Sequence, residues 1–168
     1  MQAKIRKYRN NLYIIGLGII VMGAWSVLKV FLQSYFGPDS VVMVIAQDPE
    51  WRQYRAVVIG FFTLFMLILM LIAFWVHYHI GIRAIRAGKV RKTKNLYLIW
   101  CGILCLLTAS GIPSYLRMLQ QLEDVDTVIA SCLVDLVTIG ILVDIIYSSY
   151  MIHKLEKLNN SGEVSHAG

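Results

Sequence analysis

Four long apolar stretches constrain this chain more than any other feature. They cover residues 12–36, 56–80, 96–112 and 128–152. A helix needs about 20 mainly apolar residues to cross about 30 Å of hydrocarbon, and in lipid its backbone polar groups must be bonded within the protein. The sequence therefore predicts an all-α integral membrane protein, a four-transmembrane-helix bundle that forms a single membrane domain over residues 1–168.

The composition supports this fold class and limits the partners. The chain is 58% hydrophobic and 15% charged, against roughly 45–50% and about 25% for ordinary globular domains. A chain this apolar cannot cover its surface with polar groups, so we expect the lipid bilayer to be its main partner. The net charge of +6 would suit nucleic acid, but the basic residues flank the apolar stretches. No nucleic-acid partner is predicted.

The distribution of basic residues predicts the orientation. Twelve of the sixteen precede the first stretch, separate the second from the third, or follow the fourth. The other two connections hold only Arg52, Arg55 and Arg117. Because short cytoplasmic segments collect Lys and Arg, we expect both termini on the cytoplasmic side of the plasma membrane. The first stretch is too long for a cleaved signal peptide.

This orientation assigns the connecting segments. The loop 83–95 and a flexible C-terminal tail, 159–168, are expected in the cytoplasm, and the loops 37–55 and 113–127 outside. The outer loop contains the apolar segment Val41–Ala46, which is too short to span. It is expected to lie against the chain's own helices, or to serve as a docking site for a partner.

A repeated motif marks two of the helix starts. KYRNNLYIIGLGI begins at Lys7 and RKTKNLYLIWCGI at Arg91, and six of the nine positions from Asn11 onward recur 84 residues later. The asparagine of each NLY is expected to cap its helix, and Tyr13 and Tyr97 to lie among the lipid headgroups. Either a helical hairpin was duplicated in parallel, or the two helices use the same pattern independently. Both explanations stay open.

Local signals predict the ends of the helices. Gly37-Pro38 should end the first, and Asp48-Pro49-Glu50 should start the second, whose helical pattern persists to Gly88. In the third, Gly111 and Pro113 are expected to kink or end the helix, with a short amphipathic continuation.

Ionisable side chains inside the apolar stretches are the candidate functional residues, because lipid penalises them and each needs a partner or a purpose. Lys29 and Asp135 lie at matching depths, about 11 and 13 Å from the outer side at 1.5 Å per residue. We expect them to pair, unless the lysine extends outward alone. Asp144 lies nine residues after Asp135, on the opposite face of an ideal helix. A helix polar on two faces should have neighbours on both, either within the bundle or in another protomer. Asp144 and Asp135 are therefore candidates for an ion or proton site, or for polar contacts between helices.

Metal and cofactor chemistry receive little support. His77 and His79 are weak candidates for a metal or haem iron, but they point to different faces of one helix. Cys101 and Cys105 are expected to pack as small apolar residues. No disulfide framework, metal or cofactor is predicted.

No catalytic motif occurs in the sequence, so we do not expect an enzyme; a membrane-embedded lipid or redox enzyme is the remote alternative. The first functional hypothesis is an accessory or scaffolding subunit of a membrane assembly, or a homo-oligomer, with contacts through the fourth helix and Val41–Ala46. The second is a small transporter or channel that uses Asp144, and Asp135 with it, as an ion or proton site.

Overall fold

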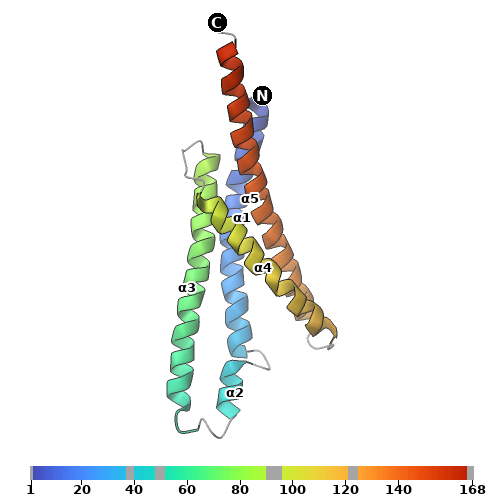
Figure 1. Cartoon of the computed structure of the whole chain (residues 1–168). Helices are drawn as coiled ribbons and strands as arrows, with labels where there is room; N and C mark the ends of the chain where they lie inside the picture. Colours follow the sequence, from blue (N-terminus) through green and yellow to red (C-terminus); the bar gives the residue numbers. More distant parts are fainter. Residues whose placement is uncertain (1, 37–39, 48–51, 90–95, 121–124, 166–168) are drawn as a thin grey trace.

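The computed structural model describes residues 2–36, 40–47, 52–89, 96–120 and 125–165. In these ranges the chain forms helices and no strand (Figure 1). The helices are α1 (Gln2–Phe36), α2 (Val41–Gln47), α3 (Arg55–Gly88), α4 (Leu96–Gln120) and α5 (Val125–Ser165). All except α2 are long and apolar enough to cross a membrane. The all-helical fold with four long apolar helices is therefore confirmed.

The helices extend further than the apolar stretches that predicted them. α1 begins at Gln2, and α5 continues to Ser165 through most of the segment expected to be a flexible tail. α4 continues through Gly111 and Pro113 to Gln120, where a kink or an end was expected. Hydrophobicity marks the part of a helix that suits lipid, but polar residues at its ends keep the same backbone hydrogen bonds. The expected signals at 37–38 and 48–50 lie outside the described residues.

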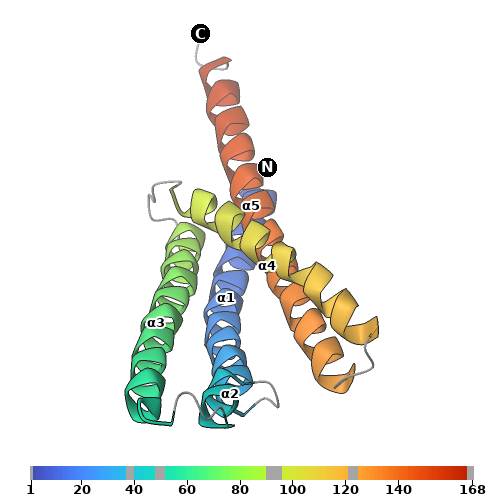
Figure 2. The same cartoon turned by 60° about the horizontal axis from the view of Figure 1, so that its bottom comes forward.

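The long helices pack in the order α3, α1, α5, α4. α1 and α3 run antiparallel, as do α4 and α5, and α1 contacts α5 between the two hairpins (Figures 1 and 2). The N-terminal part of α1 and the C-terminal part of α5 lie at the same end of the bundle, and α2 lies at the other. We call these the terminal end and the α2 end. α1 and α5 are thus the inner helices.

The apolar core is concentrated near the terminal end. Its fully buried members come from the N-terminal part and the middle of α1, the C-terminal half of α3, the N-terminal half of α4 and the middle of α5: Leu12, Ile19, Ile80, Ala84, Cys101, Leu142 and Ile145. Toward the α2 end, α4 and α5 lean away from α3 (Figures 1 and 2). The four helices therefore share one packed core near one end and separate toward the other.

Glycines bring α1 and α3 unusually close together. A Cβ on Gly81 would lie 2.6 Å from the carbonyl oxygen of Gly16 and 2.4 Å from a carbon of Ile20. A Cβ on Gly23 would lie 2.4 Å from the Cβ of His77, and one on Gly88 would lie 2.7 Å from the Arg9 carbonyl oxygen. Small residues allow such close backbone contact between membrane helices. These glycines set the spacing of the hairpin.

The apolar segment of the first outer loop forms the short helix α2. Ser40 caps it: its Oγ accepts a hydrogen bond from the Met43 N–H at 3.2 Å, and its carbonyl accepts one from the Val44 N–H at 3.0 Å. α2 contacts both α1 and α3, while the side chains of Met43 and Val44 remain exposed. The segment thus lies against the chain's own helices and still presents apolar surface.

Candidate functional site

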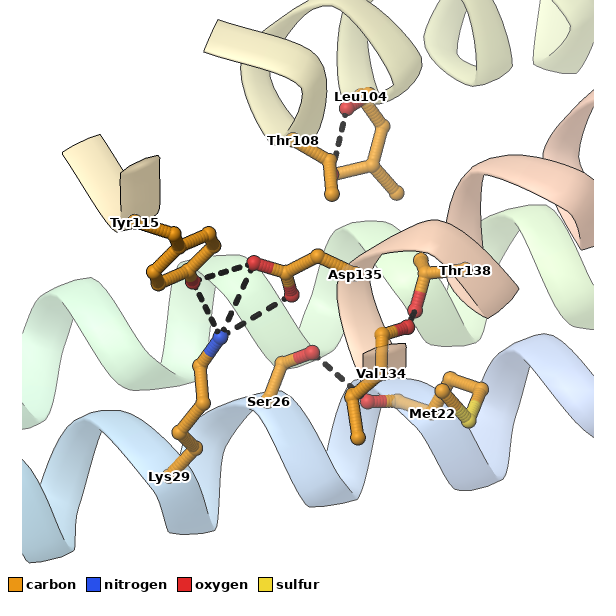
Figure 3. Close-up of polar contacts among 9 residues, drawn as sticks. All are labelled: Met22, Ser26, Lys29, Leu104, Thr108, Tyr115, Val134, Asp135 and Thr138. Atoms are coloured by element: carbon orange, nitrogen blue, oxygen red, sulfur yellow. Dashed lines mark hydrogen bonds and ion pairs between the residues drawn. The ribbon is translucent and has the colours of Figure 1, made fainter. Parts of the chain in front are cut away.

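A cluster of three polar side chains joins α1, α4 and α5 on the α2 side of the apolar core (Figure 3). Lys29 Nζ lies 3.0 Å from Asp135 Oδ1 and 3.1 Å from Oδ2, and it donates to the Tyr115 hydroxyl at 3.0 Å. The Tyr115 hydroxyl in turn donates to Asp135 Oδ2 at 2.5 Å. The ion pair expected from the matching depths of Lys29 and Asp135 is present. Tyr115 is a third member that sequence reasoning missed.

The surroundings of this cluster shield it from solvent and satisfy its polar neighbours. The side chains of Lys29 and Asp135 are 15% and 12% exposed. Ser26, Thr108 and Thr138 each donate to the carbonyl four residues earlier in their own helix (Figure 3), so they do not compete for the carboxylate. A buried pair of opposite charges stays charged only with good geometry and further hydrogen bonds, and Tyr115 supplies one. We call Lys29, Tyr115 and Asp135 the charged cluster.

A second polar contact joins α1 to α5 closer to the terminal end. Asn11 Nδ2 lies 3.1 and 3.0 Å from the two carboxylate oxygens of Asp144 and 3.0 Å from Ser148 Oγ. Ser148 also donates to Asp144 Oδ1 at 3.2 Å. Asn11 was expected to cap its helix. Because α1 begins nine residues earlier, at Gln2, the side chain of Asn11 is free to bond across the interface.

Asp135 and Asp144 both bond to α1, although they were expected on opposite faces of α5. From Val128 to Ile145, the buried positions of α5 recur with alternating spacings of three and four residues: Val128, Ser131, Asp135, Thr138, Leu142 and Ile145. Asp135 belongs to this stripe, and Asp144 flanks it. Asp135 bonds to Lys29 and Asp144 bonds to Asn11, both on α1, so the face of α5 that contacts α1 changes along the helix. The two carboxylates therefore do not require a second protomer as a neighbour.

The two copies of the NLY motif occupy different environments. Leu12 and Ile19 of the first copy are fully buried, whereas the matching Leu96 and Ile103 are 58% and 44% exposed. Tyr97 was expected among the lipid headgroups, but it is buried, and its hydroxyl shares a 2.7 Å hydrogen bond with Ser149 Oγ. Similar sequence thus supports an inner helix in α1 and an outer one in α4.

His77 and His79, the weak metal candidates, lie in different surroundings. His77 is buried against α1, and its Nδ1–H donates to the Ala73 carbonyl at 2.8 Å. The ring of His79 stacks on Trp75, with 5.3 Å between centroids. Over the described ranges, no group of three His, Cys, Asp or Glu side chains is placed to hold a metal ion. Cys101 is buried in the apolar core, and Cys101, Cys105 and Cys132 are free thiols.

In comparisons with known proteins, the chain matches no protein-family model, no curated protein and no solved structure.

Proposed function

We propose that this chain is a non-catalytic membrane protein that spans the plasma membrane four times, with both termini in the cytoplasm, and acts as an accessory or scaffolding subunit or as a homo-oligomer. The observation that carries the proposal is that both intramembrane carboxylates are bonded within the chain. Asp135 is bonded by Lys29 and Tyr115, and Asp144 by Asn11 and Ser148. Groups engaged in this way fix the relative position of the helices, which is a structural role.

The outer surface offers room for a partner. In the most apolar window of α3, none of the residues is buried by the rest of the chain. On α5, exposed apolar residues recur at alternating intervals around the open Gly140: Leu133, Leu136, Val143 and Tyr147. A Cβ on Gly140 would meet no heavy atom within 4 Å, so a second helix has space to approach there. This face and α2 are the surfaces we assign to protein contacts.

Native mass spectrometry after gentle extraction tests the scaffold role. We expect a mass above the 19.1 kDa of one chain, either from copies of the chain or from a copurifying protein. Replacement of Gly140 by Leu should shift the species toward one chain, because a bulky side chain blocks close approach of a second helix. Gly60→Leu is the matched control, since Gly60 is open too but lies on α3. A single chain in every preparation would contradict the proposal.

One observation supports the alternative of a small transporter or channel. Over the described residues, the hydrogen bonds to the Asp144 carboxylate come from neutral groups and no ion pair reaches it. An intramembrane carboxylate without a neutralising cation is a candidate proton or cation site. Asp135 is a weaker candidate because Lys29 already balances its charge.

Asp144→Asn separates the two roles. For a scaffold, we expect liposomes with wild-type protein and liposomes with the variant to show the same proton leak, measured with an enclosed pH dye. The variant should lose roughly 0.6–1.7 kcal/mol of stability, the size of a polar contact between membrane helices. Asp126→Asn, at an exposed acid in the first turn of α5, is the control. Proton flux that the wild type supports and Asp144→Asn abolishes, at unchanged native mass, would establish the transporter.

Cysteine labelling tests the orientation. A cysteine at Lys89 should be protected from a membrane-impermeant maleimide in intact cells and react after permeabilisation. A cysteine at Gln53 should react in both. Both positions are exposed and lie at opposite ends of α3, and the unchanged protein gives the background of the three native thiols. Labelling of both positions from the same side would overturn the four-span topology.

A further inference from the structure

A large basic pocket opens at the terminal end of the bundle. It has a volume of about 1290 Å³ and is lined mainly by the N-terminal part of α1 and the C-terminal end of α3. Among the residues that the structure describes, its basic residues are Arg6, Lys7, Arg9 and Lys89, and no acidic residue lines it. The pocket therefore brings several positive charges together in one concave site between helices.

The floor of the pocket is held in place by contacts between α1 and α3. Gly88 lies so close to α1 that an added Cβ would be 2.7 Å from the Arg9 carbonyl oxygen. Lys89 Nζ lies 5.1 Å from the centroid of the Tyr13 ring, a distance at which the cation is attracted to the ring face. The Tyr13 ring and the Lys89 ammonium group thus line the same side of the pocket, in contact with each other.

Arg9 is positioned but not fully bonded. Its Nη2 lies 2.6 Å from Glu156 Oε1, which connects this end of α1 to α5. Its Nε is buried and has no acceptor among the described residues. A buried guanidinium donor without an acceptor is costly, and guanidinium groups bind phosphate oxygens through paired hydrogen bonds. Arg9 also lines the pocket, and its side chain is 27% exposed, so a guanidinium group of this kind is present where a phosphate would bind.

The position of the pocket along the helices indicates which kind of molecule would carry the phosphate. Tyr13 and Arg9 flank the start of the first apolar stretch at Leu12, and Gly88 and Lys89 follow the end of the apolar part of α3. If the four helices cross a membrane, as proposed above, the pocket lies at the level of the lipid headgroups. Basic pockets between helices on the cytoplasmic side are suited to anionic headgroups. We propose that this pocket binds the phosphate group of an anionic phospholipid.

Lipid binding to the full chain in a neutral detergent tests the site, with short-chain phosphatidylglycerol and phosphatidylcholine titrated and followed by native mass spectrometry. We expect the anionic lipid to bind at least about tenfold tighter. The triple variant Arg6→Gln, Lys7→Gln, Lys89→Gln should weaken it by on the order of 100-fold, about fivefold for each basic residue. All three side chains are exposed, so helix content should stay unchanged, and stability should fall by no more than about 0.5–1 kcal/mol through the lost contact of Lys89 with Tyr13.

A control variant removes the same charge outside the pocket: Lys4→Gln, Arg83→Gln, Lys154→Gln. These residues lie toward the same end but do not line the pocket, and we expect less than about a fivefold loss. Equal losses in the two triple variants would overturn the proposal. Inorganic phosphate is titrated in parallel; binding as tight as that of the lipid would overturn the lipid assignment and identify a soluble phosphate as the occupant. These results do not depend on oligomeric state, so their failure is distinct from failure of the scaffold role.

Discussion

Replacing Gly81 with alanine is expected to lower the free energy of unfolding by about 1–3 kcal/mol, the usual cost of overpacking a close contact. The new methyl group would meet the Gly16 carbonyl oxygen at 2.6 Å and two side-chain carbons of Ile20, at 2.4 and 2.9 Å. A side chain can change rotamer, but the carbonyl belongs to the helix backbone and cannot. α1 and α3 must therefore separate, which also disturbs the core residues beside them. Thermal unfolding in detergent micelles, followed by circular dichroism, measures the loss.

Gly60→Ala is the matched control for Gly81→Ala. Gly60 lies on the same helix, and a Cβ there would meet no heavy atom within 4 Å. Alanine favours a helix over glycine by up to about 1 kcal/mol in water, so this variant should be neutral or slightly stabilised. Equal unfolding temperatures for the two variants would mean that the close approach of α1 to α3 is not what holds this hairpin together.

Lys29→Met is expected to have the largest effect of any substitution at a charged residue, a loss of about 3–5 kcal/mol. The change leaves the Asp135 carboxylate buried with only the Tyr115 hydroxyl as a described partner. Asp135→Asn should cost less, because a lysine stem of four methylenes can carry its charge toward solvent. Unfolding in detergent and the amount of protein recovered from membranes provide the two measurements.

The double variant Lys29→Met, Asp135→Leu, measured together with its two single variants Lys29→Met and Asp135→Leu, separates the loss of the ion pair from the cost of leaving one buried charge unpaired. With both charges removed, no unpaired ion remains, and replacement by apolar residues is often close to neutral. We expect the double variant to be more stable than Lys29→Met alone, with a coupling of about 0.5–3 kcal/mol between the sites. Lys154→Met, at an exposed lysine of α5, controls for the change of residue type. Strict additivity of the two single losses would show that the ion pair contributes nothing.

The sequence was sufficient for the number and type of the long helices and for one polar contact. An apolar run of about 20 residues has few alternatives to a membrane helix, so the spans could be located without packing information. Lys29 and Asp135 were found because each is an ionisable group in an apolar stretch and their distances from the outer ends match. Both inferences use position along the chain alone.

The remaining contacts depend on which faces of the helices pack against each other. The position of a residue along the chain does not determine this. Tyr115 was missed because Pro113 was expected to end or kink α4. A proline inside a membrane helix is tolerated when neighbouring groups satisfy the backbone, and α4 continues past it. The glycines of the α1–α3 contact did leave a signal: Gly16 and Gly23 are seven residues apart, as are Gly81 and Gly88. Residues seven apart lie on one face of a helix, and small residues on a shared face favour close packing of membrane helices.

The concentration of the apolar core near the terminal end has a consequence for motion. Separating the two hairpins at the α2 end would expose little of the shared core, so the energy that resists this movement comes largely from the charged cluster. Regions with few buried apolar contacts are those that open most readily. Loss of the pair between Lys29 and Asp135 would therefore loosen the α2 end first, while the shared core holds the helices together near the terminal end.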